Sequence, residues 1–420
     1  MLRLAACFAA FASCAVLAQP LPTAAPEKAG FSPQGLARID RFFAREIEAA
    51  RTPGAVIAIA RDGRLVHYKS YGYLDKSKNE PMPLDAMFQI ASMTKVMVAV
   101  GALTLVEDAR LPLYSRVDQY IPAIGKMNVG VVGANGEVTT EPVKRPMLVH
   151  DLFRHTSGLA YGANASSPVQ KAFPAGSAPA SVEYTGDELI AKLGTISLLH
   201  QPGTVWQYGL SLDVLGLVME KVTGKRLDDY MREALWDKVR MPDTTFAVPP
   251  EKRRRIAQPL AIDPITGKPQ RILSLDKPAR FDCAGGCAFS TVGDYVRFGQ
   301  MLLDGGAIDG RRVLSPKTLE WASVDHLPPG ARNQVAGTEP HREGYGFSLL
   351  GAVRVRPGLA SIPGSVGDYS WNGANGTQFW VDPQERLVVV VGMAAPGEIR
   401  KIHREQVIDL VYGAMAELRK

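Results

Sequence analysis

The chain has 420 residues, with 48 Lys and Arg against 42 Asp and Glu, and 46% of its residues are hydrophobic. This ordinary globular composition excludes a disordered chain, a collagen-like fibre and a coiled-coil rod. The net charge of +6 is spread along the sequence except for one cluster, Lys252-Arg253-Arg254-Arg255. A nucleic-acid interface would need a stripe of such clusters with interleaved aromatic residues, so we expect no nucleic-acid partner.

The N-terminus has the pattern of a secretory signal peptide. One positive charge precedes an apolar run over residues 4–17, and Ala18 follows it as the expected cleavage position. The run is shorter than the ~20 residues that span a bilayer, and no other segment is apolar enough to do so. We therefore expect a signal peptide over residues 1–18, a mature domain over residues 19–420, and a periplasmic or secreted location. A lipoprotein cleavage site at Cys14 is the alternative.

The mature chain keeps two cysteines, Cys283 and Cys287. An oxidising compartment favours a disulfide between them across a short loop, and two free buried thiols are the alternative. No other Cys or His lies close in the sequence to complete a zinc site, so no metal is expected. Phosphate-loop, dinucleotide, zinc-protease and Gly-x-Ser-x-Gly motifs are missing from the sequence, and we expect no cofactor.

Periodicity and turn residues predict the elements in chain order. Residues 19–35 are rich in Pro and Ala and are expected to be loosely attached. Asp62-Gly63 supplies the turn of a hairpin, and Gly224 supplies a helix C-cap. The expected helices are 33–50, 92–108, 210–223 and 399–418; the strands are 55–60, 65–68, 344–350, 352–355, 378–381 and 387–393; loops occupy 125–145 and 160–182.

Strands at both chain ends and helices between them predict an α/β (α+β) fold class. One antiparallel sheet, flanked by helices, would form a lobe from residues 35–90 and 285–420. The mainly helical lobe would be inserted as residues 91–284. A cleft between two such lobes is the natural place for a small-molecule site.

The segment with the clearest chemistry is Ser92-Met93-Thr94-Lys95, at the start of a predicted helix. Side chains three positions apart share a helix face, so we expect Ser92 and Lys95 to be neighbours. Free N–H groups at a helix start can bind an oxyanion. A lysine that has lost its proton in a dry site can activate a serine. The pattern alone is weak, because an N-cap serine followed by an exposed lysine is commoner.

Further segments, in the same order, resemble the penicillin-recognising serine enzymes, most closely class C β-lactamases and family VIII carboxylesterases. The resemblance covers almost the whole mature chain and implies a β-lactamase/transpeptidase-like fold. The matching segments are Ser92-Met93-Thr94-Lys95, Leu152-Phe153-Arg154-His155-Thr156-Ser157-Gly158-Leu159, Pro202-Gly203-Thr204-Val205-Trp206-Gln207-Tyr208, Asp213-Val214-Leu215-Gly216, Val222-Thr223-Gly224-Lys225, residues 287–295, Trp371-Asn372-Gly373 and residues 376–383.

The resemblance also implies roles for individual residues. Ser92 would be the nucleophile that becomes acylated. Lys95 and Tyr208 would share its proton, and Tyr208 would pass that proton to the leaving group. The backbone N–H groups of Ser92 and Ala374 would form the oxyanion hole.

Two departures from the β-lactamase pattern indicate the substrate class. The second motif is usually Tyr-x-Asn, but this chain has Tyr208-Gly209-Leu210, and a leucine cannot give the hydrogen bonds of an amide. The third motif is usually Lys-Thr-Gly, but this chain has Trp371-Asn372-Gly373, which removes a cation. Both look like the esterase branch. The candidate substrate-binding residues are Leu210, Trp371, Asn372 and Gly373.

Ester cleavage needs less help for its leaving group than amide cleavage. The lost polar groups therefore predict a secreted serine esterase that hydrolyses small or short-chain carboxylic esters through an acyl-enzyme on Ser92, with weak β-lactam hydrolysis as a side reaction. The alternatives are a true β-lactamase or D-Ala peptidase, a non-catalytic penicillin-binding-like domain, and an acyltransferase. The expected partner is a small ester or β-lactam-like molecule, and the sequence gives no oligomeric state.

Overall fold

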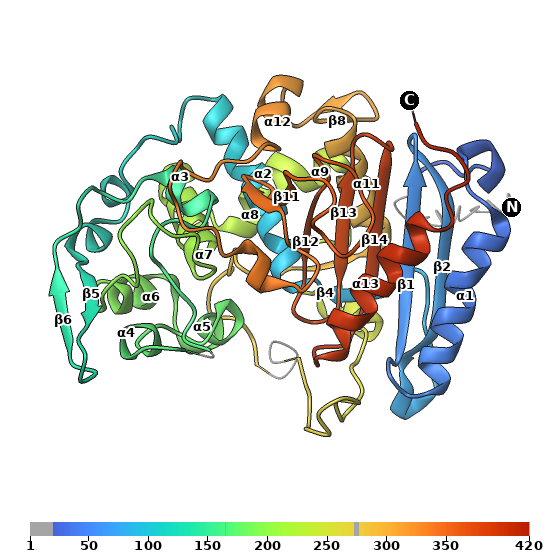
Figure 1. Ribbon diagram of the computed structural model, residues 1–420, viewed down its shortest axis with the longest axis horizontal. Coiled ribbons are helices and arrows are strands. Elements are labelled where there is room, and N and C mark those ends of the chain that lie inside the picture. The colour runs from blue at the N-terminus through green and yellow to red at the C-terminus, as the bar shows by residue number, and fades with distance from the viewer. Residues whose placement is uncertain (1–19, 164, 273–276, 420) are drawn as a thin grey trace, which may run out of the picture.

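The computed structural model describes residues 20–163, 165–272 and 277–419. The predicted signal peptide, residues 1–18, lies outside these ranges. Within them, an eight-stranded antiparallel sheet runs through the molecule and carries helices on both faces (Figure 1). This arrangement confirms the predicted fold class.

The strands and helices have the following bounds. The strands are β1 (Gly54–Arg61), β2 (Arg64–Asp75), β3 (Glu80–Pro81), β4 (Met87–Gln89), β5 (Val129–Val132), β6 (Val138–Glu141), β7 (Phe289–Thr291), β8 (Ala307–Ile308), β9 (Arg311–Arg312), β10 (Tyr345–Ser348), β11 (Gly351–Arg354), β12 (Tyr369–Asn372), β13 (Gln378–Asp382) and β14 (Leu387–Met393). The helices are α1 (Pro33–Glu48), α2 (Thr94–Glu107), α3 (Val149–Phe153), α4 (Pro168–Lys171), α5 (Ser177–Glu183), α6 (Gly186–Leu193), α7 (Ser211–Thr223), α8 (Leu227–Met231), α9 (Asp237–Val239), α11 (Val292–Leu303), α12 (Pro316–Ala322) and α13 (Ile399–Tyr412).

Both ends of the chain contribute strands to the large sheet. Its order is β10-β11-β12-β13-β14-β1-β2-β3, so the N-terminal hairpin pairs with the last C-terminal strand. The β1–β14 register runs from Ala55 opposite Met393 to Arg61 opposite Leu387. Every residue of β1 is buried, because helices cover this strand on both sides. A run of Ala, Val and Ile suits such a two-sided environment.

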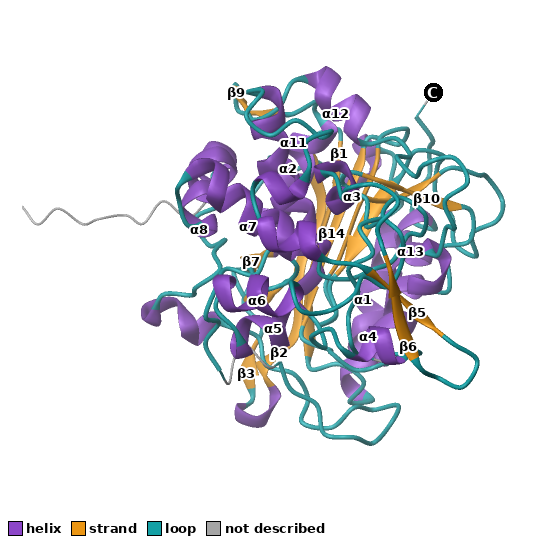
Figure 2. Ribbon diagram, turned by 90° about the vertical axis from the view of Figure 1, so that its left-hand side faces the viewer, coloured by secondary structure: helices purple, strands orange, loops and turns teal. Residues whose placement is uncertain are grey.

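Two groups of helices cover the two faces of the sheet. Side chains alternate along β1: Val56 and Ala58 face the core under α2 and α11, whereas Ile57 and Ile59 face the core under α1 and α13. α1 and α13 also pack against each other. The helices between α2 and α8 stand in front of the sheet in Figure 2.

The inserted part of the chain, expected to be mainly helical, also contains a β-hairpin. Residues 129–141, expected to be a loop, form the β5–β6 hairpin, which lies far from the large sheet in Figure 1. Val131, Val132 and Val138 of this hairpin are exposed, whereas Val129 is buried. Of the helices in the described ranges, none combines the length and the apolarity that a bilayer crossing needs.

Both chain ends differ from the expectations. The segment before α1 is anchored, not loose, because the N–H of Leu65 donates to Pro22 O at 2.7 Å and extends the edge of β2. The last helix ends at Tyr412 and not at residue 418. Beyond it the chain turns back, and the N–H of Ala416 donates to Gly30 O at 2.8 Å. Each end therefore gains backbone hydrogen bonds that helix periodicity does not reveal.

α11 approaches the sheet closely at Gly299. A Cβ at this position would lie 2.5 Å from Val388 Cγ1 and 2.9 Å from Phe379 Cε2. We expect Gly299→Ala to lower the free energy of unfolding by about 1–3 kcal/mol, because two buried neighbours must shift. Urea unfolding measures the change. Gly337→Ala is the control, since a Cβ there meets nothing within 4 Å, and equal stabilities of the two variants would contradict the close approach.

Candidate active site

Ser92 stands at the point where the chain enters α2. A single 3-10 turn, Ala91–Met93, leads into the helix. Ala91 has φ of 45°, a left-handed conformation that residues other than glycine rarely adopt. Ser92 stays partly exposed while nearly all of α2 behind it is buried. The hydroxyl is therefore accessible, but its backbone is held by the core.

Lys95 is the buried partner of this serine. Its side chain is only 4% exposed. Its Nζ donates to Ser92 Oγ at 3.3 Å, to Tyr161 Oη at 3.1 Å, and to the carbonyl oxygen of Gly285. An ammonium has three N–H donors, so all of them are used. The structure thus places Ser92 and Lys95 together, as their spacing predicts.

That Lys95 and Tyr208 share the serine proton stays a prediction, and the surroundings of Lys95 act on its pKa in opposite directions. Burial alone would lower the pKa of the Lys95 ammonium. The oxygens of Tyr161 and Tyr208 and the carboxylate of Asp213 outweigh burial and raise this pKa above its ordinary value. A charged lysine at this position orients the Ser92 hydroxyl and stabilises a nearby oxyanion.

A closed set of hydrogen bonds surrounds the Lys95 ammonium, and it includes Tyr161 and Ser177, which no sequence motif singles out. Tyr161 Oη hydrogen-bonds to Ser177 Oγ at 2.7 Å, and Ser177 Oγ donates to Asp213 Oδ2 at 2.7 Å. Asp213 Oδ1 accepts from the N–H of Gly285 at 2.9 Å. No spacing pattern links these residues, although Asp213 belongs to a segment that carried the resemblance. The ring holds a buried carboxylate near Lys95 without a direct ion pair.

Tyr208 reaches the same ammonium from the loop before α7. Lys95 Nζ lies 4.6 Å from the centroid of the Tyr208 ring. The indole Nε1–H of Trp371, on β12, donates to Tyr208 Oη at 3.2 Å. Rings of His155 and Phe347 pack around this pair. Tyr208 is therefore held between a cation and a hydrogen-bond donor, with its oxygen positioned by Trp371.

The two predicted oxyanion donors, Ser92 and Ala374, lie on segments that pack together. Thr377 Oγ1, in the β12–β13 turn, donates to Ile90 O at 3.1 Å. A Cβ on Gly373 would lie 2.3 Å from the same oxygen, so only glycine allows this approach. Ala374 is exposed beside it. The turn thus brings Ala374 to the start of α2, and its role as a donor remains a prediction.

Two predicted substrate-binding residues do not face an accessible site. Leu210 is fully buried at the start of α7, where its leucine side chain packs in the core. Asn372 follows Trp371 on β12 and so points to the opposite face of the sheet. There its Nδ2 donates to Glu339 Oε1 at 3.4 Å. The substrate-binding roles of Leu210 and Asn372 therefore stay predictions. Trp371 contacts Tyr208, and Gly373 lies against Ile90, just before the start of α2.

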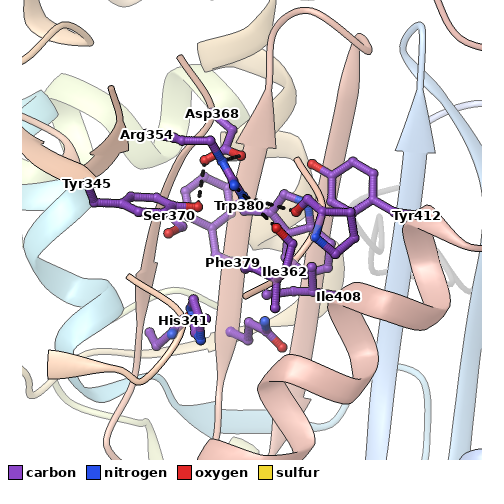
Figure 3. Close-up of a pocket in the computed structure, with 13 residues that line it drawn as sticks. His341, Tyr345, Arg354, Ile362, Asp368, Ser370, Phe379, Trp380, Ile408 and Tyr412 are labelled. Atoms are coloured by element: carbon purple, nitrogen blue, oxygen red, sulfur yellow. Dashed lines mark hydrogen bonds and ion pairs between the residues drawn. The ribbon is translucent and has the colours of Figure 1, made fainter. Parts of the chain in front are cut away.

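A separate pocket lies behind the sheet (Figure 3). Its lining includes Ser370 on β12, Trp380 on β13 and Ile408 on α13. Trp380 and Ile408 belong to the core under α13, not to the core under α2. The ion pair between Arg354 and Asp368, at 2.8 Å, closes one side. This pocket therefore opens on the face away from Ser92.

Cys283 and Cys287 are joined by a disulfide. The short loop that they close contains Gly285, whose carbonyl accepts from Lys95 and whose N–H donates to Asp213. The disulfide therefore constrains the backbone that completes the ammonium site. Across residues 20–163, 165–272 and 277–419, no group of three or more His, Cys, Asp or Glu side chains is arranged to hold a metal ion.

A serine at a helix start, a buried lysine one turn later and a tyrosine on the same ammonium define a class of serine hydrolases built on an antiparallel sheet. The chain belongs to the Beta-lactamase family, which it matches over residues 39–411. This match spans both the sheet and the inserted helices.

Comparisons with individual proteins agree with this family. Over 360 residues the chain is 33% identical to Protein Rv1367c of Mycobacterium tuberculosis, covering 82% of this chain and 87% of that protein. It is 28% identical to esterase EstB of Burkholderia gladioli over 385 residues, or 86% and 92% of the two chains. The solved structure of EstCE1, described as a hydrolase with promiscuous acyltransferase activity, has a TM-score of 0.71 and 23% identity, covering 90% of this chain and 99% of that one. The protein is a serine hydrolase.

Tyr161 gives a direct test of the hydrogen-bonded ring. We expect Tyr161→Phe to lower kcat/KM for p-nitrophenyl acetate about 10- to 100-fold, because a hydrogen bond to a charged group contributes about 1.5–3 kcal/mol. Circular dichroism would check that the variant is folded. Tyr114→Phe, at a side chain that is 79% exposed, is the matched control. Wild-type kinetics in Tyr161→Phe would show that Lys95 does not need this contact.

Proposed function

We propose that the protein is a secreted or periplasmic serine esterase that hydrolyses small or short-chain carboxylic esters through an acyl-enzyme on Ser92. The observation that carries this proposal is the shared contact at Lys95. Its ammonium donates to the Ser92 hydroxyl at 3.3 Å and lies 4.6 Å from the ring centroid of Tyr208. Secretion rests on the N-terminal sequence pattern alone.

Acylation begins when Ser92 Oγ attacks the carbonyl carbon of the ester. The serine proton passes to the oxygen of Tyr208, which takes part as a phenolate beside the Lys95 ammonium. The negative charge that develops on the carbonyl oxygen is bound by the N–H groups of Ser92 and Ala374. When the tetrahedral intermediate collapses, the alkoxide leaves with the proton from Tyr208, and the acyl group stays on Ser92.

Deacylation repeats these steps with water. A water molecule gives a proton to the Tyr208 phenolate and attacks the acyl carbon. The intermediate collapses, Ser92 Oγ leaves and recovers the proton from Tyr208, and the carboxylic acid departs. Lys95 keeps its charge throughout and compensates the phenolate, which agrees with its raised pKa.

The preference for esters rests on Trp371. Where the β-lactamase motif has a lysine, this chain has a buried indole that donates to Tyr208. The motif therefore offers no cation to the carboxylate of a β-lactam, whereas a neutral ester needs none. The relative EstB, named as an esterase, supports the same substrate class. Weak β-lactam hydrolysis is the expected side reaction.

The test is a substrate series measured on wild type and Ser92→Ala. We expect wild type to hydrolyse p-nitrophenyl acetate and butyrate faster than the octanoate, and nitrocefin only weakly. Ser92→Ala should lose at least ~10³-fold in kcat, because it removes the nucleophile. Ser166→Ala, at an exposed serine, should keep full activity. Faster turnover of nitrocefin than of esters would identify a β-lactamase, and ester hydrolysis by Ser92→Ala would exclude this mechanism.

Acyl transfer is a second candidate, favoured by the description of EstCE1. An alcohol would then replace water as the acceptor of the acyl group on Ser92. With p-nitrophenyl butyrate and millimolar 1-butanol, we expect chiefly butyric acid, because Ser92 is accessible to water. Gas chromatography measures the ratio of acid to butyl ester. A predominance of the ester would make the protein an acyltransferase.

A further inference from the structure

Trp371 lacks the charge of the lysine that usually occupies its motif, yet a cation lies directly against it. Arg342, in the segment before β10, places its Cζ 4.3 Å from the centroid of the Trp371 ring. The Arg342 side chain is 1% exposed. A guanidinium at this distance over an indole face is a cation–π contact, and it is stronger when water is excluded.

The guanidinium of Arg342 has few direct partners among the described residues. Its Nη1 donates to Thr338 Oγ1 at 3.0 Å, whereas its Nε and Nη2 have no hydrogen-bond partner there. Within the described ranges, no Asp or Glu oxygen forms an ion pair with it. Glu339, in the same segment, pairs with Arg404 instead.

The other charges in this region are largely compensated. Arg354 pairs with Asp368, just as Arg404 pairs with Glu339. Burial lowers the pKa of His341 to about 3, so this imidazole is neutral. Burial also lowers the pKa of Arg342, and Glu339, Tyr345 and Tyr208 oppose that shift. A guanidinium nevertheless stays protonated in proteins.

Several elements bring ionisable groups close to Arg342 and Tyr208. These groups are Lys95 on α2, His155 and Tyr161 in the inserted part, Asp213 on α7, Glu339 and His341 in the segment before β10, Tyr345 on β10, Arg354 on β11, Asp368 before β12, and Arg404 on α13.

We propose that Arg342 is a positioning residue that supplies, from outside the motif, the positive charge that Trp371-Asn372-Gly373 lacks. The charge acts on Tyr208 through the indole. A cation on the ring face draws electron density from the indole and makes its Nε1–H a stronger donor. That N–H donates to Tyr208 Oη at 3.2 Å, and a stronger donor favours the phenolate form of its acceptor.

This inference rests on the proposed role of Tyr208 as the proton acceptor. Tyr208 then lies between two cations, with the Lys95 ammonium on its ring side and Arg342 beyond Trp371. The second cation contacts neither the substrate nor the reacting atoms. A buried charge stabilises the phenolate but offers no binding partner to a substrate carboxylate. This arrangement therefore suits the hydrolysis of a neutral ester.

The test is the pH dependence of kcat/KM for p-nitrophenyl acetate. Arg342→Met removes the charge and keeps an apolar chain of similar length. Its loss makes the phenolate harder to form, so we expect the acidic limb of the profile to move to higher pH by about one unit. Arg342→Lys, which keeps a cation, should stay closer to wild type. Arg232→Met is the control, since Arg232 lies 5.9 Å from the Trp236 ring centroid and outside the site.

A double-mutant comparison asks whether the charge acts through the indole N–H. Trp371→Phe removes that donor, so Arg342→Met should add little further shift in this background. Thermal unfolding checks each variant, and Arg342→Gln replaces Arg342→Met if the latter does not fold.

An unchanged acidic limb in folded Arg342→Met or Arg342→Gln would overturn the proposal. A shift of equal size with and without Trp371 would overturn the route through the indole. Ester hydrolysis that survives Ser92→Ala would instead reject the proposed function, so the two failures are distinguishable.

Discussion

The buried ammonium of Lys95 is the charge on which the arrangement of the site depends. Removing an ammonium from water is costly unless every N–H finds an acceptor. Here the acceptors are a serine hydroxyl, a tyrosine hydroxyl and the Gly285 carbonyl. These groups come from three parts of the chain, so the requirement to satisfy one cation brings the nucleophile, the inserted helices and the disulfide loop together.

The sheet supplies the rigidity that this cation needs. β12 carries Trp371 toward Tyr208, and the next turn presses Gly373 against Ile90, immediately before the nucleophile turn. α2 is buried along most of its length, which prevents Ser92 and Lys95 from moving independently. A buried helix and the end of strand β12 thus meet at one accessible hydroxyl, an arrangement suited to a preorganised reaction site.

Aromatic side chains predominate around Lys95 and Tyr208. Tyr161 and Tyr208 lie against the ammonium, and Trp371, which replaces the second lysine of the β-lactamase motifs, donates to Tyr208. Rings exclude water and leave few hydrogen bonds for a charged substrate. In this protein a positive charge lies in the interior instead, at Arg342 over the Trp371 ring. In our proposal this charge acts on Tyr208 without contacting the substrate.

The sequence by itself determined the features that depend on neighbours along the chain. It placed Ser92 and Lys95 on one helix face, the β1–β2 hairpin around its Asp-Gly turn, and β14, because local periodicity and turn chemistry govern them. The tertiary structure alone decided that Lys95 is buried against Tyr161 and the Gly285 carbonyl, that Leu210 lies in the core and Asn372 contacts Glu339, and that Arg342 lies on Trp371. Protonation and accessibility are set by groups distant in the sequence: Tyr161 and Gly285 lie 66 and 190 residues from Lys95, and only folding brings their oxygens to its ammonium.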